Sequence, residues 1–326
     1  MGEFELLARI RGRLPAAGSR VRVGMGDDAA VTVPGGATAT SVDAVVDGVH
    51  FRRERCSLAQ VGHKALATAL SDLAAMGAEA GEAYVVLGVP PGMSEDECIE
   101  LIDGVAALAE WTGTTLAGGD VTRAPALTVA TTAVGHAARP EAFVTRAGAR
   151  PGDALVLTGE IGGAAAGLLL GERPELASAV SEETAERLRA RQLEPRPRLA
   201  AGRALARAGA TAMIDLSDGL GADAGHIAER SEVGIRIDAH AIPLANGVAE
   251  VAAAAGLDPL PMAASGGEDY ELLAALPPER LADAATAAGE AETTLAVIGT
   301  VVEGAGVEIR RPGGRTLEPS GYDQLR

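Results

Sequence analysis

The chain has 326 residues, 47% of them hydrophobic and 22% charged, a composition typical of a globular protein long enough for two domains. Its formal net charge of −17 and its pI of about 4.7 argue against nucleic acid and anionic membranes as partners, because both are bound through basic faces. The same charge repels phosphorylated ligands unless divalent cations bridge them to acidic side chains.

The first half of the sequence predicts mixed helices and strands, with an apolar strand set backed by two helices. Strand-like segments on either side of Pro34-Gly35-Gly36 predict a β-hairpin at that turn signal. Ser94 and Glu97 have capping-box spacing and predict a helix start. The expected elements are helices over residues 3–14, 58–76 and 95–108, and strands over 29–33, 37–43, 83–89, 114–117 and 126–134.

The periodic spacing of apolar residues is interrupted over residues 146–153, which are predicted to form a loop, and a new apolar pattern starts at Ala154. We therefore predict two domains, over residues 1–148 and 149–326. The second is expected to alternate strands and helices, so the fold class is α/β, or α+β. Its expected strands cover 154–158, 212–214, 234–237, 270–275 and 294–302, and its helices cover 164–170, 183–192, 199–208, 220–231 and a segment between the last two strands.

Aspartates recur beside glycines and at the ends of apolar strands. A single aspartate beside a glycine is common in turns, but a repeated series of them is a stronger indication of a metal site. Mg²⁺ prefers a few carboxylates together with substrate phosphates, and clustered carboxylates in a partly dry cleft are tolerable only when cations lie among them. The series consists of Gly26-Asp27-Asp28, Ser41-Val42-Asp43, Ser71-Asp72, Gly118-Gly119-Asp120 and Asp215-Leu216-Ser217-Asp218-Gly219.

Several of these segments also have a purely structural interpretation. Gly118-Gly119-Asp120 could bring main-chain N–H groups close to a phosphate, or could form a simple tight turn. Ser217 or Asp218 could bind metal or serve as a helix N-cap. Segment 266–270 could recognise a ligand through its acids or be a solvated turn. The glycines of 159–167 lack a P-loop lysine and favour close packing.

Other features narrow the class of protein. His50 could contact a phosphate or a ring, although a lone histidine beside apolar residues is more often structural. A serine hydrolase is disfavoured because the sequence has no Gly-x-Ser-x-Gly elbow. Cys56 and Cys98 lack the spacing of a metal site or of a disulfide framework. No leader-like start and no apolar stretch of ~18 residues is present, so we expect a cytoplasmic protein without a membrane partner.

Taken in order, the segments resemble the thiamine-monophosphate kinase family, a branch of the superfamily that contains aminoimidazole ribonucleotide synthetase. The resemblance implies that superfamily's two-domain fold. It includes an N-terminal ATP- and Mg²⁺-binding domain that forms a homodimer through its sheet, a C-terminal α/β domain and an active cleft between them. The motifs that carry the resemblance are GEF (2–4), GDDAA (26–30), DGVHF (47–51) with Asp43 before it, LSDLAAMGA (70–78), GGD (118–120), TRAG (145–148), IDLSDGL (214–220), GGEDYEL (266–272) and GYD (321–323).

The resemblance also implies a reaction, in which ATP phosphorylates thiamine monophosphate directly and in line to give thiamine diphosphate. The implied magnesium ligands are Asp28 with Asp27 beside it, Ser41, Val42 (main chain), Asp43, Asp72, Asp120, Asp215 and Asp218, for several Mg²⁺ ions. The implied ATP contacts are Gly119, Asp120, Arg146 and Ser217, and the implied thiamine-monophosphate contacts are His50, Glu268 and Leu325. The residues expected to matter most for catalysis are Asp43, Asp72, Asp120 and Asp218.

The sequence departs from the family pattern at three positions. Ala69 replaces a frequent Asn, Val42 a common Thr, and Leu325 the usual aromatic residue that helps to hold the thiamine rings. These departures affect substrate packing and leave the carboxylates in place. The alternatives are a synthetase of the same superfamily, whose expected catalytic Cys is not matched by Cys56 or Cys98, and a non-catalytic nucleotide or thiamine-phosphate sensor.

Overall fold

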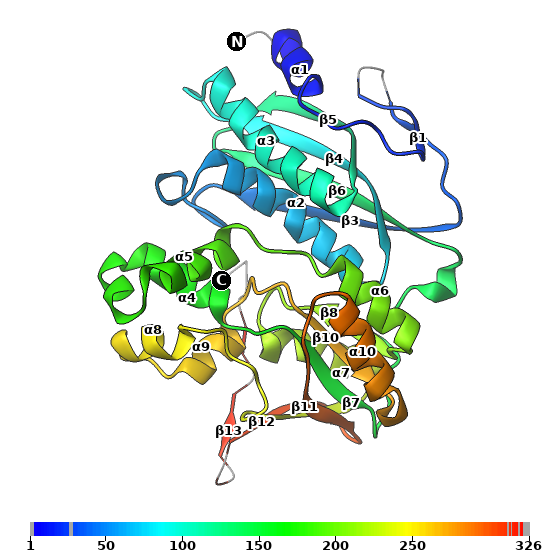
Figure 1. Ribbon diagram of the computed structural model, residues 1–326, viewed down its shortest axis with the longest axis vertical. Coiled ribbons are helices and arrows are strands. Elements are labelled where there is room, and N and C mark those ends of the chain that lie inside the picture. The colour runs from blue at the N-terminus through cyan, green and yellow to red at the C-terminus, as the bar shows by residue number, and fades with distance from the viewer. Residues whose placement is uncertain (1–2, 26–28, 312, 314, 319, 322–326) are drawn as a thin grey trace. The chain divides into compact units, whose positions relative to one another are not determined.

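The computed structural model describes residues 3–25, 29–311, 313, 315–318 and 320–321, and the chain divides into two units (Figure 1). The first unit comprises Met1–Leu73 and Ala78–Ala142, and the second comprises Ala74–Gly77 and Phe143–Arg326. The boundary between residues 148 and 149 stays a prediction.

A four-stranded sheet forms the centre of the first unit, in the order β3-β6-β4-β5. Only β4 and β5 run parallel. Helices α2 and α3 lie across one face of the sheet (Figure 1). The elements are α1 (Glu3–Arg11), β1 (Val21–Val23), β2 (Val31–Thr32), β3 (Ala37–Val46), α2 (Leu58–Ala75), β4 (Glu79–Val89), α3 (Glu95–Thr112), β5 (Thr115–Arg123) and β6 (Thr128–Ala137), with short 3₁₀ turns at Arg53–Arg55 and Pro140–Ala142.

The predicted hairpin across Pro34-Gly35-Gly36 is wrong. β2 pairs with β1 in a separate two-stranded sheet, whereas all ten residues of β3 pair with β6. The turn signal is real, but a turn determines only where the chain changes direction. The distant β6 offers β3 a longer ladder of hydrogen bonds than the two-residue β2 could, and this decides the pairing.

The predicted capping box is confirmed. The Ser94 side chain accepts from the Glu97 N–H at 3.2 Å, and the Glu97 carboxylate accepts from the Ser94 N–H at 2.7 Å. Gly113 ends α3 in the left-handed conformation with φ 71°. These local interactions begin and end the helix that covers β5.

The second unit is built on a seven-stranded sheet in the order β13-β12-β9-β11-β7-β10-β8, in which only β12 and β9 run parallel. The strands are β7 (Ala154–Thr158), β8 (Ala212–Asp215), β9 (Gly234–Asp238), β10 (Leu272–Leu276), β11 (Leu295–Val302), β12 (Gly306–Arg310) and β13 (Thr316–Leu317). The helices are α4 (Gly163–Glu172), α5 (Glu182–Leu193), α6 (Leu199–Ala208), α7 (Leu220–Ser231), α8 (Val248–Ala254), α9 (Pro259–Ser265) and α10 (Leu281–Glu290), with 3₁₀ turns at Pro174–Ala179 and Pro278–Arg280.

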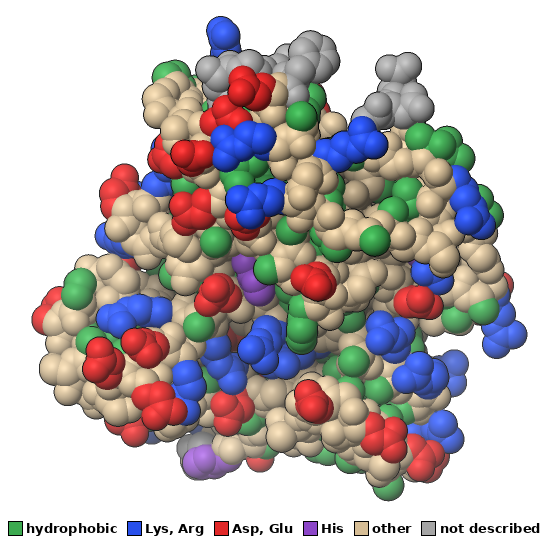
Figure 2. Space-filling model, turned by 45° about the horizontal axis from the view of Figure 1, so that its top comes forward, with side chains coloured by type: hydrophobic (Ala, Val, Ile, Leu, Met, Phe, Trp, Pro, Cys, Tyr) green, Lys and Arg blue, Asp and Glu red, His purple; other side chains and the backbone are tan. Residues whose placement is uncertain are grey.

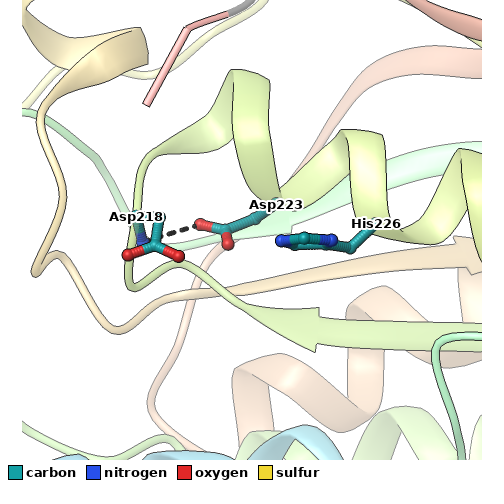
Figure 3. Close-up of side chains that lie close together, drawn as sticks. All are labelled: Asp218, Asp223 and His226. Carbon is teal, nitrogen blue, oxygen red and sulfur yellow. Dashed lines mark hydrogen bonds between the residues drawn. The ribbon is translucent and has the colours of Figure 1, made fainter. Parts of the chain in front are cut away.

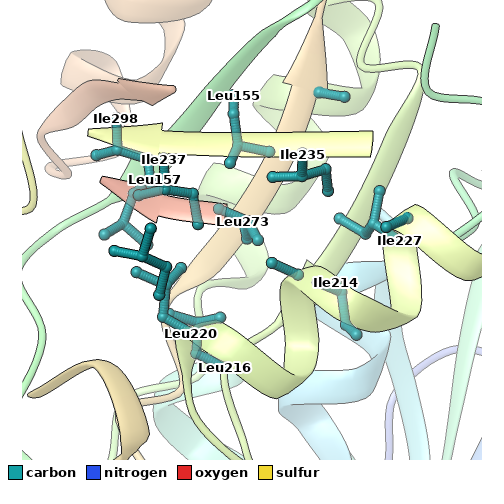
Figure 4. Packing of buried hydrophobic residues seen from close by; sticks show 14 of the residues in the cluster. Leu155, Leu157, Ile214, Leu216, Leu220, Ile227, Ile235, Ile237, Leu273 and Ile298 are labelled. Carbon is teal, nitrogen blue, oxygen red and sulfur yellow. The ribbon is translucent and has the colours of Figure 1, made fainter. Parts of the chain in front are cut away.

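The main core of this unit lies between the sheet and α7 and is entirely aliphatic, as the low aromatic content predicts. Leu157, Ile214 and Leu273 from the strands meet Leu220 and Ile227 from the helix (Figure 4). A second apolar cluster joins α4, α5 and α8. The predicted packing role of the 159–167 glycines fits this cluster, because a Cβ at Gly167 would lie 2.1 Å from the Leu188 carbonyl oxygen of α5.

Candidate active site

Three of the expected ligands in the first unit lie on or against the covered face of its sheet. Strand alternation places the Ser41 and Asp43 side chains on this face and Val42, which is 69% exposed, on the other. The Ser41 hydroxyl donates to the carboxylate of Asp72, which lies near the end of α2. The structure therefore brings together Ser41 and Asp72, with Asp43 two residues along the same strand, as an oxygen-rich group.

Asp120 does not join that group within one copy of the chain. It lies on β5, at the opposite edge of the sheet from β3, which at about 4.8 Å per strand is roughly 14 Å away. Its register partner on β4 is Val86, which is 41% exposed, so Asp120 points from the open face. The Gly118-Gly119-Asp120 segment also lies within β5 rather than in a turn after the strand.

Gly119 has a packing reason to be glycine. A Cβ at this position would lie 2.0 Å from the Val85 carbonyl oxygen of the adjacent strand. Because the clashing atom belongs to the backbone of a central strand, the contact cannot be relieved by a side-chain rotation. The close approach of β5 to β4 therefore explains Gly119 without reference to a ligand, although its exposed main chain stays available to one.

His50 is held in a tight turn at the end of β3. Its main-chain N–H donates to the Val46 carbonyl at 2.9 Å, and its ring Nδ1 accepts from the Val46 N–H at 3.2 Å. A neutral imidazole that accepts at Nδ1 carries its proton on Nε2. The turn thus orients the ring and determines which nitrogen is the donor.

Two loops of the second unit run side by side and hold the remaining expected residues. Asp215 is the last residue of β8, and the loop that follows it contains Ser217 and Asp218, whereas the second loop precedes β10 and contains Glu268. The Glu268 N–H donates to the Ser217 carbonyl at 2.8 Å. A Cβ at Gly267 would lie 2.2 Å from that same oxygen, so the glycine permits the approach. The structure therefore brings Glu268 beside the Asp215–Asp218 segment.

Asp223 is a site residue that the sequence reasoning missed. From the first turn of α7 its Oδ2 accepts from the Asp218 and Gly219 N–H groups, at 3.1 and 3.0 Å. The N-cap of α7 is Gly219, which has no side chain, so the alternative that Ser217 or Asp218 serves as the N-cap does not hold. Asp223 takes over that role because its carboxylate reaches back to the helix start.

Asp223, Asp218 and His226 form a compact donor group (Figure 3). One ligand atom from each lies within 4.8 Å of the others. Burial, followed by the nearby charges of Asp215 and Asp218, raises the pKa of Asp223 to about 8. The three-residue spacing of Asp223 and His226 on one helical face was a usable signal, but it gains meaning only once α7 is known to start beside Asp218.

The Glu268 loop has an unusual backbone. Glu268 and Tyr270 have positive φ angles of 68° and 50°, a conformation that side chains rarely adopt. Asp269 between them accepts from the Gly162 and Ala164 N–H groups at the start of α4, at 2.8 and 3.2 Å. Burial raises the pKa of Asp269 to about 7 against the opposing effect of these hydrogen bonds. The helix start therefore holds the strained loop.

An ion pair between Arg198 and Glu271 lies next to the same loop. Glu271, which is 1% exposed, accepts from Arg198 Nε at 2.9 Å and Nη2 at 2.5 Å, and from the Thr158 hydroxyl at 2.7 Å. A buried carboxylate is tolerated when it is paired and hydrogen-bonded in this way. The pair connects the beginning of α6 to the residue that follows the strained segment.

Comparisons with known proteins agree with this architecture. Residues 26–137 match the N-terminal domain and residues 150–311 the C-terminal domain of the AIR synthase related protein family. The thiamine-monophosphate kinase of Mycobacterium tuberculosis is 40% identical over 279 residues, which cover 84% of this chain and 80% of the relative. The chain belongs to the thiamine-monophosphate kinase family. The family and the two-domain fold class expected from the motifs are thereby confirmed.

Solved structures of the family extend the match. The crystal structure of thiamine-monophosphate kinase from Stenotrophomonas maltophilia K279a superposes with a TM-score of 0.85 at 36% identity, covering 97% of this chain and 98% of that one. A structure described as AaThiL complexed with AMPPCP and TMP has a TM-score of 0.77 at 31% identity, covering 87% and 86% of the two chains.

The other positions expected of a family member are placed as follows. Arg146 is exposed, and its main-chain carbonyl accepts from the Ser231 hydroxyl at 3.1 Å. Ala69, where the family often has Asn, is fully buried in α2. Asp27, Asp28 and Leu325 lie outside the described residues. Among the helices that are described, none is both long and apolar enough to cross a membrane.

Proposed function

We propose that this protein transfers the γ-phosphoryl group of ATP to thiamine monophosphate, giving thiamine diphosphate and ADP. The observation that carries the proposal is the match to relatives named thiamine-monophosphate kinase over more than four fifths of this chain, 84% in the first case. The structure complexed with AMPPCP and TMP supports ATP and thiamine monophosphate as the two substrates. The expected enzyme class, a kinase, is confirmed by the same relatives.

Mg²⁺ fits the donor groups of both units. Ser41, Asp43 and Asp72 in the first unit offer only oxygen atoms, the ligands that this ion prefers. In the second unit, Asp215 and Asp218 lie close enough to Asp223 to raise its pKa, a repulsion that a bound cation would relieve. Ser41, Asp43 and Asp72 in the first unit and Asp215 and Asp218 in the second would hold the ion, which would supply neutralisation of phosphate charge.

The chain's own residues contribute alignment rather than acid–base chemistry. The attacking group is a phosphate oxygen that is already anionic, so no strong general base is required and no covalent phosphoenzyme forms. We assign His50, with its proton on Nε2, and Glu268, on the strained loop, to thiamine monophosphate. Arg146 and the exposed main chain of Gly119 are assigned to the phosphates of ATP. Positioning two polyanions is the main contribution of proteins to phosphoryl transfer.

The distribution of surface charge supports the need for cations. Among the described residues visible in Figure 2, arginines are interspersed with acidic side chains and form no broad basic area. With a net charge of −17, the protein cannot attract two polyanions by its overall field. Local cations at the carboxylate groups therefore have to provide the attraction. The two described cysteines are free thiols, which agrees with the proposed cytoplasmic location.

We further propose a homodimer formed through the open face of the four-stranded sheet. Val42 and Val86 are 69% and 41% exposed there, on β3 and β4. Strands β6 and β5 complete the face, and Asp120 lies at its edge. A second copy covering this surface would remove exposed apolar area and would place Asp120 at the interface. Light scattering on the wild type and on Val42→Asp tests this, and a monomeric wild type would contradict it.

The kinase proposal is tested with Asp72→Asn and Asp218→Asn. Each should reduce ADP and thiamine-diphosphate formation by at least roughly 100-fold at saturating substrate, because a ligand to a charge-neutralising cation is lost. Asp96→Asn, whose wild-type side chain is 89% exposed on α3, is the matched control and should retain full activity. Near-normal turnover in both site variants, or ligand binding by the wild type without product, would overturn the proposal.

A further inference from the structure

Lys64 is the only lysine in the sequence, although Lys and Arg together number 28. Every other basic position is therefore arginine. Lys64 is also 1% exposed and is among the largest fully buried side chains of the described chain. Lysine is almost never fully buried unless it is paired, because removing an ammonium group from water is costly. A single lysine at such a position calls for a specific explanation.

The contacts of Lys64 lead to the His50 turn. Lys64 lies on α2, and its Nζ donates to the main-chain carbonyl of His50 at 3.2 Å. The Val46 carbonyl accepts from the His50 N–H, and the His50 Nδ1 accepts from the Val46 N–H. The N–H, the carbonyl and one ring nitrogen of His50 are thus all hydrogen-bonded. The ammonium group supplies a hydrogen bond that connects this turn to α2.

Other hydrogen bonds involve the remaining residues of the turn. Gly48 has a φ of 83°, and its N–H donates to the Phe51 carbonyl at 2.8 Å within the turn itself. Val49 at the tip is 56% exposed. Asp47 is joined to the sheet through its N–H, which donates to the Leu127 carbonyl at 2.9 Å. Lys64 adds to these contacts a hydrogen bond from α2 to the main chain of the turn.

We propose that Lys64 is a positioning residue, which holds the His50 turn in the geometry that binds thiamine monophosphate. This inference rests on the proposed function and adds to it a residue that does not touch the substrate. An arginine would not substitute, since its longer, planar guanidinium has five donors to satisfy in a space that holds one ammonium group. This explains why lysine occurs here in a chain that otherwise uses arginine.

Kinetics separate positioning from general stability. Lys64→Met keeps a similar shape without the donor, and Lys64→Arg keeps the charge. Both should raise the KM for thiamine monophosphate at least roughly ten-fold, because a small displacement of a binding group has large effects. The KM for ATP should stay within about two-fold. Leu108→Ala on α3, a buried position remote in sequence from the turn, is the control for lost stability and should leave both KM values unchanged.

A second measurement does not depend on catalysis. Because the chain has one lysine, amine-selective acetylation followed by peptide mapping reports on Lys64 and, separately, on the N-terminal amine. Lys64 should be acetylated slowly, through local opening, and saturating thiamine monophosphate should slow the reaction further, whereas ATP alone should not. Acetylation at the rate of an exposed amine, or equal protection by both ligands, would overturn the inference.

The outcomes for the two proposals are distinguishable. A wild type that makes no thiamine diphosphate would end the proposed function. The acetylation assay and calorimetric binding of thiamine monophosphate would still test Lys64 in that case. An active wild type combined with an unchanged thiamine-monophosphate KM in Lys64→Met would end the positioning role alone.

Discussion

The stability of the second unit should fall as the pH rises from 5 to 8, because of Asp269. The pKa of this residue is raised from 3.8 to about 7, chiefly by burial. In the unfolded chain Asp269 is ionised above about pH 4, whereas in the folded protein it stays protonated until about pH 7. The stabilisation by the neutral form is therefore complete below the unfolded pKa and is lost as the pH rises through the folded pKa.

The size of the effect follows from the same two values. One pKa unit corresponds to about 1.4 kcal/mol, and linkage between pKa values of 3.8 and about 7 gives a loss of about 2–3 kcal/mol between pH 5 and pH 8. For a unit of this size, that loss lowers the midpoint of thermal unfolding by roughly 5–10 °C. Asp269 keeps some exposure to solvent, so we expect the lower end of this range.

The assay compares thermal unfolding of the wild type and Asp269→Asn across this pH range. Asn cannot ionise, so the variant should lack this component of the pH dependence even if it loses a hydrogen bond to α4 at every pH. Asp258→Asn is a matched control, because Asp258 caps α9 but has a lowered pKa, chiefly through Arg311. It should run parallel to the wild type above pH 5. Parallel curves for the wild type and Asp269→Asn would refute the reasoning.

Three further changes test the packing around the site. Arg198→Met should lower the free energy of unfolding, measured in urea, by about 3–5 kcal/mol, because Glu271 then stays buried and charged without its partner. Adding Glu271→Leu should restore most of this loss, and a double variant as unstable as Arg198→Met would contradict the role of the ion pair. Gly119→Ala should destabilise the first unit by about 1–3 kcal/mol through its clash with Val85, measured by urea unfolding without ligands, and an unchanged midpoint would exclude the clash. Ser94→Ala should cost about 1 kcal/mol in the same assay, and a loss near zero would show that the capping box is dispensable.

Local sequence signals predicted much of the fold. The bounds of α6, α7 and β7 agree with the predicted 199–208, 220–231 and 154–158, and the capping box of α3 was identified from two residues. These features depend on neighbours within one or two turns of the chain. The elements β1, α8, α9, β12 and β13 were missed; each has two to seven residues, a length at which periodicity is weak, although strands of similar length such as β7 were found.

The sequence by itself determined the family, the enzyme class and the identity of the candidate acids, because these are carried by short motifs in a particular order. The tertiary structure decided which of them meet. It separated Asp120 from Asp43 by strand order and face, added Asp223 to the Asp218 loop, and connected Lys64 to His50. These outcomes depend on contacts between residues far apart in the chain, where the burial and pairing of one element are decided by another. No local pattern contains that information.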